Sequence, residues 1–122
     1  RRREPFLAGE LDGKTLGILG LGRLGRLVAG YGQAFGMQVQ AYDTDSTAFD
    51  RCPIPVKSVS QEELYQTSDI LSLHIPSTPE NRNAVDAHQL SLMPKHAVLI
   101  NTARGQVLHE AALLKALMSK EL

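Results

Sequence analysis

Three glycines stand at a spacing suited to binding a phosphate group, in the run Gly20-Leu21-Gly22-Arg23-Leu24-Gly25. Gly20 permits a sharp turn out of a strand, because glycine adopts backbone conformations that are closed to residues with a Cβ. Gly22 leaves room for a pyrophosphate to approach the backbone, and Gly25 lets the following helix pack close to the strand. The first turn of that helix offers unpaired N–H groups and the positive end of its dipole. The run therefore predicts a binding site for a dinucleotide.

Asp43 supplies the second part of this chemistry, at the end of a second strand pattern and about 20 residues after the glycines. A carboxylate in this place can accept hydrogen bonds from both hydroxyls of an adenine ribose. The same charge would repel a 2′-phosphate, so Asp43 favours NAD over NADP. The alternative is a tight strand–helix turn followed by an ordinary turn aspartate. The coincidence of strand, glycines, helix and acid favours the dinucleotide site.

A third group of chemically suited residues follows the last strand pattern, in the run Asn101-Thr102-Ala103-Arg104-Gly105. The guanidinium of Arg104 is permanently charged, and its planar fork matches a carboxylate in two hydrogen bonds. The small residues Thr102 and Ala103 leave space for a flat ring beside it. The alternative is a surface arginine after a strand. Together with the glycine run, the pattern favours an arginine that binds substrate.

Alternating strand and helix patterns place these residues at one edge of a sheet. Strands are expected at residues 15–19, 38–42, 55–57, 70–73 and 97–100. Helices are expected after the glycine run as far as Phe35, after an N-cap at Ser60, and at residues 86–93 and 110–118. This alternation predicts an α/β fold with a doubly wound parallel sheet, a Rossmann-type nucleotide-binding domain. Ligands bind at the carboxyl ends of such strands, where residues 20–25, Asp43, 74–76 and 101–104 are expected to meet.

Length and composition agree with a single nucleotide-binding domain over residues 1–122. The 13 basic and 13 acidic residues balance, so net charge indicates neither a nucleic-acid nor a membrane partner. Cys52 is the only cysteine, which excludes a disulfide framework and favours a reducing compartment. No signal peptide and no run of about 20 apolar residues is visible. We therefore expect a cytoplasmic protein, and no metal site.

At this point the sequence resembles the D-isomer-specific 2-hydroxyacid dehydrogenases. The resemblance extends from about Gly9 to the end of the chain and rests on five motifs: residues 11–18 before the glycine run, Phe35-Gly36-Met37, Tyr42-Asp43, His74-Ile75-Pro76-Ser77-Thr78 and residues 101–105. It implies an NAD-binding domain that is an incomplete part of a two-domain enzyme. That enzyme would transfer a hydride between NAD(H) and a D-2-hydroxy acid or 2-oxo acid. The resemblance also implies a homodimer for the full-length parent.

The resemblance gives each matched residue a role. Arg104 would be the catalytic arginine, holding the carboxylate and carbonyl of the substrate while bordering the cofactor. Cofactor contacts are implied for Arg23 and Leu24 at the pyrophosphate, Asp43 at the ribose, His74, Ile75 and Pro76 at the adenosine half, and Thr102 and Ala103 at the nicotinamide. The catalytic histidine and its glutamate partner are expected beyond Leu122, in the family's usual order. We therefore expect the chain alone to bind NAD without turnover.

Two alternatives from other functional classes remain open at this stage. The C-terminal-binding corepressors share this domain and its arginine, so the chain could belong to an NAD-sensing interaction protein. An S-adenosylmethionine methyltransferase also uses a glycine loop and an acid, but would not explain residues 101–105. The chain departs from the family pattern at Asn81, His96 and His109. His96 replaces a usual turn glycine and is expected on the solvated surface.

Overall fold

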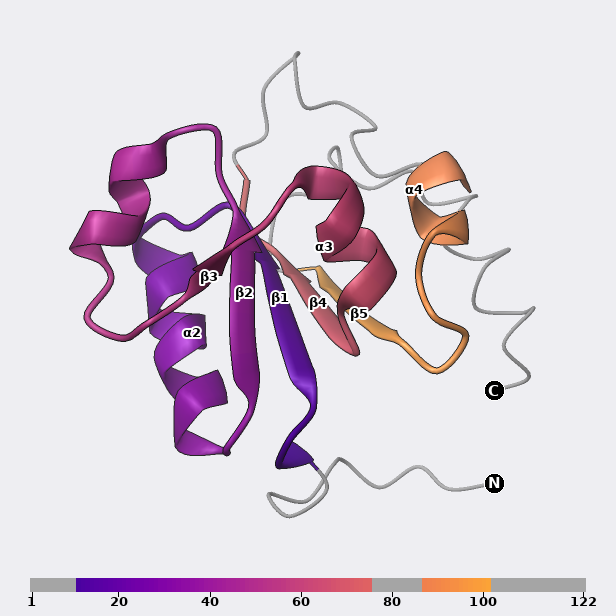
Figure 1. Cartoon of the computed structure of the whole chain (residues 1–122), viewed down its shortest axis with the longest axis horizontal. Coiled ribbons are helices and arrows are strands. Elements are labelled where there is room, and N and C mark those ends of the chain that lie inside the picture. The colour runs from indigo at the N-terminus through magenta and orange to yellow at the C-terminus, as the bar shows by residue number, and fades with distance from the viewer. Residues whose placement is uncertain (1–10, 76–86, 102–122) are drawn as a thin grey trace.

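Five parallel strands form the centre of the computed structural model, which describes residues 11–75 and 87–101 (Figure 1). The strands are β1 (Thr15–Leu19), β2 (Gln38–Tyr42), β3 (Lys57–Ser58), β4 (Ile70–Leu73) and β5 (Val98–Asn101). Their spatial order is β3-β2-β1-β4-β5, and every neighbouring pair is parallel. The chain therefore starts at the centre, builds outward on one side, and returns to build on the other. This is the predicted doubly wound arrangement.

Helices cover both faces of this sheet, and each face has its own hydrophobic core. Figure 1 shows α2 (Arg23–Ala34) on one side of the strands and α3 (Gln61–Thr67) on the other. Leu16 and Ile18 of β1 belong to the core under α2, whereas Leu19 belongs to the core under α3 and α4 (Ala87–Ser91). Side chains alternate between faces along a strand, so β1 needs apolar residues on both sides.

Helix α2 packs very closely on the sheet because its buried positions are small. Gly25, Ala29 and Gly32 form its buried side. A Cβ at Gly32 would collide with Cδ2 of Leu16, so any larger residue there would force the Leu16 side chain to shift. The helix ends where Gly36 adopts φ +81°, a left-handed conformation that glycine reaches without strain.

Several element boundaries differ from the sequence prediction. Strand β3 covers Lys57–Ser58 and not residues 55–57, because it pairs with β2 only at Gln40 and Ala41. Strand β5 begins at Val98, one residue later than predicted, and it is only partly buried, because Ile100 is 43% exposed. In the described sheet, β5 is an edge strand with β4 as its single neighbour, which leaves its outer side open. The helix predicted at residues 110–118 lies outside the described residues.

Helix α4 is also shorter than predicted and ends at Ser91. Met93, two residues later, is followed by Pro94. A residue before proline is disfavoured in helical conformation, so the chain leaves the helix before that point. None of the helices in the described ranges is both long enough and apolar enough to cross a membrane.

Asp69 joins three strands at their amino ends. Its Oδ2 accepts a hydrogen bond from Thr15 N–H at 2.8 Å, and its Oδ1 lies 2.5 Å from His96 Nε2. The backbone carbonyl of Asp69 accepts from Val98 N–H at 2.9 Å. Partial burial raises the pKa of Asp69, but the bonds from Thr15 and His96 outweigh it and hold the pKa below its ordinary value. His96 is exposed, as expected, yet it takes part in this junction.

Candidate functional site

The glycine loop turns sharply out of β1 at Gly20, as predicted. Gly20 has φ +95°, and its N–H donates to the carbonyl of Tyr42 at 2.9 Å, which ties the loop to the end of β2. A Cβ at Gly20 would lie 2.9 Å from the backbone carbonyl of His74 and from the side chain of Ile75. Both the turn and this close approach therefore require glycine. The loop, β2 and the end of β4 meet here.

Gly22 and Gly25 also have the physical surroundings that the motif predicts. Gly22 is the N-cap of α2, and nothing lies within 4 Å of the place a Cβ would occupy. No side chain caps this helix start with a hydrogen bond. A Cβ at Gly25 would collide with the carbonyl oxygen of Gly20. The arrangement fits a pyrophosphate, which would meet an open loop and an uncapped helix start.

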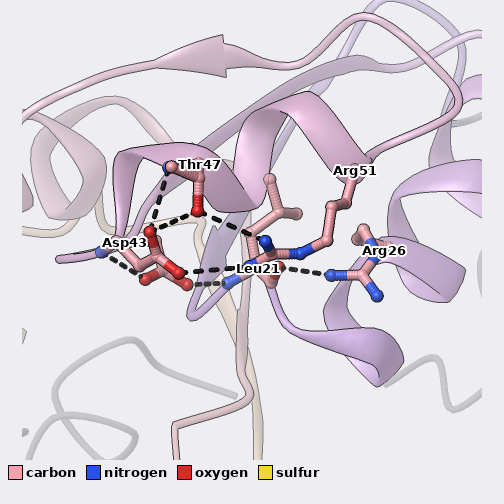
Figure 2. A network of polar contacts seen from close by, with 6 residues as sticks. Leu21, Arg26, Asp43, Thr47 and Arg51 are labelled. Carbon is pink, nitrogen blue, oxygen red and sulfur yellow. Dashed lines mark hydrogen bonds and ion pairs between the residues drawn. The ribbon is translucent and has the colours of Figure 1, made fainter.

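Asp43 is held in place by two backbone N–H groups (Figure 2). Its Oδ2 accepts from Leu21 N–H at 2.7 Å, and its Oδ1 accepts from Asp45 N–H at 2.8 Å. Ionised carboxylate oxygens have about four acceptor sites between them, so acceptor capacity remains for further donors. The glycine loop thus orients the Asp43 carboxylate, and the contact of this carboxylate with ribose hydroxyls stays a prediction.

A polar network beyond Asp43 was not predicted from the sequence. Residues Ser46–Arg51 form a 3-10 helix, η1, and Asp45 is its N-cap. Asp45 Oδ1 accepts from Thr47 N–H at 3.0 Å and from Thr47 Oγ1 at 2.6 Å, and Arg51 pairs with Asp45 Oδ2 at 3.1 Å. The Thr47 hydroxyl, then its N–H and Arg51, lower the pKa of Asp45. The run Asp45-Ser46-Thr47 is a helix-start signal that could have revealed this element.

His74 stands at the carboxyl end of β4, next to the glycine loop. Its N–H donates to the carbonyl of Leu19 at 2.8 Å, and its Nε2 lies 2.7 Å from Oγ of the buried Ser72. Burial lowers the pKa of His74 below its ordinary value. The imidazole is therefore neutral near pH 7, and Ser72 fixes the direction of one of its nitrogens.

Burial of His74 predicts a measurable dependence of stability on pH. The unfolded chain takes up a proton at the ordinary histidine pKa of about 6.5, whereas the folded chain resists it. Stability is therefore lost as pH falls from about 7 through 6.5 towards the lowered folded pKa. We expect His74→Gln to flatten the decline in the free energy of unfolding over this interval, as measured by urea titration. An unchanged decline would mean that His74 does not cause it.

The structure describes some of the predicted site residues and not others. It brings together the glycine loop, Asp43, His74 and Ile75, and leaves Arg23 and Leu24 exposed at the start of α2. Asn101 ends β5 in register with Leu73, the residue before His74. The remaining predicted residues lie outside the described residues: Pro76, Thr102, Ala103 and Arg104.

Comparison with known proteins decides the family. A family model for the NAD-binding domain of D-isomer specific 2-hydroxyacid dehydrogenases matches residues 1–122. The chain belongs to this family. The resemblance noted in the sequence is thus confirmed, and so is NAD as the cofactor of this type of domain.

Individual relatives of this NAD-binding domain are dehydrogenases and reductases. It is 44% identical to glyoxylate reductase of Aeropyrum pernix over 112 residues, which are 92% of this chain and 33% of the relative. It is 41% identical to D-3-phosphoglycerate dehydrogenase of Bacillus subtilis over 115 residues, which are 94% of this chain and 22% of the relative. The domain therefore spans about a fifth to a third of the length of these relatives.

Solved structures of dehydrogenases have the same fold as this NAD-binding domain. D-lactate dehydrogenase of Aquifex aeolicus, solved with NAD and lactic acid, superposes with a TM-score of 0.83 at 38% identity, covering 100% of this chain and 36% of that one. The relatives named here give no support to the corepressor alternative or to a methyltransferase.

Proposed function

We propose that this chain is the nucleotide-binding part of an enzyme that transfers a hydride between NAD(H) and a D-2-hydroxy acid or 2-oxo acid. The observation that carries the proposal is Asp43, whose carboxylate is oriented by Leu21 N–H and Asp45 N–H beside an uncapped helix start. Family membership and relatives that are named glyoxylate reductase and phosphoglycerate dehydrogenase support this chemistry. Residues 1–122 would form one domain of a two-domain protein.

In this proposal, bound NAD supplies or accepts the hydride, and the residues of the chain bind and orient both reactants. The open backbone at Gly22 and the start of α2 would hold the pyrophosphate, with Arg23 and Leu24 beside it. Asp43 would bind the ribose. His74, Ile75 and Pro76 would contact the adenosine half, Thr102 and Ala103 the nicotinamide side, and Arg104 the substrate carboxylate. The proton for the substrate oxygen would come from a histidine that acts as general acid.

The first experiment tests the ribose contact. We expect Asp43→Ala to weaken NAD binding by about 1–3 kcal/mol, the scale of a hydrogen bond to a charged group, which corresponds to roughly a tenfold to hundredfold rise in Kd. Isothermal titration of the unmodified chain should also show tighter binding of NAD than of NADP. Asp50→Asn, which removes an exposed charge from η1, serves as the control and should leave NAD binding unchanged. Equal or tighter binding of NADP by the unmodified chain would contradict the assignment of Asp43.

We also propose that the protein is a homodimer through an apolar stripe on α2. The stripe consists of Leu24, Leu27, Tyr31 and Phe35, which are 52%, 53%, 58% and 44% exposed. Their spacing places them along one side of the helix. Antiparallel packing of two copies would bury both stripes.

Dimerisation through the stripe can be tested by a charge at its centre. Leu27→Glu should convert a dimer into a monomer in sedimentation equilibrium, because a buried unpaired carboxylate is costly. Gln33→Glu places the same charge on another exposed position of α2 and should leave the mass unchanged. A dimer that survives Leu27→Glu would place the contact elsewhere.

We further propose a cytoplasmic protein without nucleic-acid or membrane partners. The equal numbers of basic and acidic residues, 13 each, support the absence of charge-driven binding to either. The single cysteine, Cys52, supports a reducing compartment.

A further inference from the structure

We propose that Asp45 is a second determinant of cofactor choice, because it occupies Arg51, which would otherwise bind the 2′-phosphate of NADP. The inference rests on the proposed placement of the adenine ribose at Asp43. In NAD-dependent recognition, Asp43 would repel a 2′-phosphate directly. Asp45 would add to this effect, because its ion pair with Arg51 keeps the guanidinium from neutralising the 2′-phosphate.

Asp45 is linked directly to Asp43, the proposed ribose ligand. Asp45 N–H donates to Asp43 Oδ1 at 2.8 Å, so the backbone of Asp45 lies against the carboxylate assigned to the ribose. The side chain of Asp45 is directed to η1, where it caps the 3-10 helix through Thr47. Asp45 thus connects the carboxylate of Asp43 to the 3-10 helix that carries Arg51.

Two side chains, those of Asp45 and Thr47, hold the guanidinium of Arg51. One guanidinium nitrogen donates to Asp45 Oδ2 at 3.1 Å, and another donates to Thr47 Oγ1 at 3.2 Å. Thr47 Oγ1 in turn donates to Asp45 Oδ1 at 2.6 Å, which closes a three-membered network. Both terminal nitrogens of the guanidinium, which would recognise a phosphate, therefore already donate to side chains of η1 and its N-cap.

The ion pair between Arg51 and Asp45 is easily broken. The side chains of Arg51 and Asp45 are 54% and 55% exposed, and exposed ion pairs contribute little to stability. Removing the carboxylate charge would therefore release the guanidinium without unfolding η1. The other arginine drawn in Figure 2, Arg26, donates to the carbonyl of Leu21 at 3.3 Å and not to an acid. Arg51 is thus the cation in this network whose charge is neutralised by a carboxylate.

The test is a set of variants of the full chain, with NAD and NADP titrated separately. Asp43→Ser should shift preference towards NADP by removing the repulsive charge. Adding Asp45→Asn should tighten NADP binding by a further factor of about two to five, the range for release of an exposed ion pair. Asparagine caps helices as well as aspartate does, so η1 should be retained. The extra gain should disappear with Arg51→Gln and shrink at high salt.

Asp50→Asn in the Asp43→Ser background is the matched control, because it removes one exposed negative charge from the same 3-10 helix. An equal gain from Asp50→Asn, or a gain that persists in Arg51→Gln, would overturn the role of Asp45 and leave a general charge effect. If the unmodified chain bound neither NAD nor NADP, that result would contradict the proposed function, and this inference would fall with it. Binding of NAD with no response to Asp45→Asn would overturn only this inference.

Discussion

Replacing Arg104 with lysine is expected to lower kcat/KM by about 100-fold in a protein that combines this domain with a substrate domain, comparable to the loss of one charge-stabilising donor in other active sites. Lysine keeps the positive charge but lacks the planar fork that makes two hydrogen bonds to a carboxylate. Binding of NAD alone should change little, because the arginine is proposed to address the substrate. Loss of NADH absorbance with glyoxylate, pyruvate and hydroxypyruvate in turn would measure the effect.

A matched control for Arg104 is Lys57, an exposed cation on the edge strand β3. Lys57→Arg also exchanges one cationic side chain for another without touching the proposed substrate site, and kcat/KM should stay the same. If Arg104→Lys also left kcat/KM near normal, Arg104 would lose its proposed role in binding the substrate carboxylate.

A single methyl group at Gly25 is expected to cost about 3 kcal/mol of folding free energy, at the upper end of what overpacking costs in protein cores. In Gly25→Ala, the new Cβ would collide with the backbone oxygen of Gly20 and press on Cγ2 of Ile18, 3.2 Å away. A backbone oxygen cannot rotate aside as a flexible side chain can, so α2 would have to move away from β1. Urea unfolding would measure the loss, and NAD titration the distortion of the loop.

Two other glycines provide controls for Gly25→Ala, because each has open space where the Cβ would stand. Gly30 lies inside α2, and Gly30→Ala should raise stability by about 0.5–1 kcal/mol through the better helix propensity of alanine. Gly22→Ala should leave stability almost unchanged but weaken NAD binding, since the methyl group would occupy the proposed approach of the pyrophosphate. Similar losses of stability from all three substitutions would contradict the packing argument.

The central strands and the glycine loop could be predicted because their signals are local. β1, β2 and β4 have the predicted bounds, since each is a short run whose own composition favours a strand. β3 could not be located in this way. Lys57 and Ser58 are not strong strand formers, and they are a strand because β2 presents Gln40 and Ala41 to them. Its length is decided by a partner distant in sequence.

In the candidate site, too, local sequence patterns could be predicted and contacts that depend on side-chain directions could not. The spacing from the glycines to Asp43 predicted which residues meet, and the contact of Leu21 N–H with Asp43 agrees with that prediction. The link through Asp45 to Arg51 could not be read from spacing, because it depends on side-chain directions within η1. The junction of His96 with Asp69 joins residues 27 apart in sequence, and no pattern indicates it. The roles of Thr102, Ala103 and Arg104 stay predictions.

Asp69 lies at the amino ends of the strands, whereas Gly20, Asp43 and His74 gather at the carboxyl ends. The aspartate ties β1, β4 and β5 together where no cofactor contact is proposed. Substitutions at Asp69 or His96 are therefore expected to change the stability of the domain and to leave the proposed nucleotide contacts at the opposite end of the sheet intact.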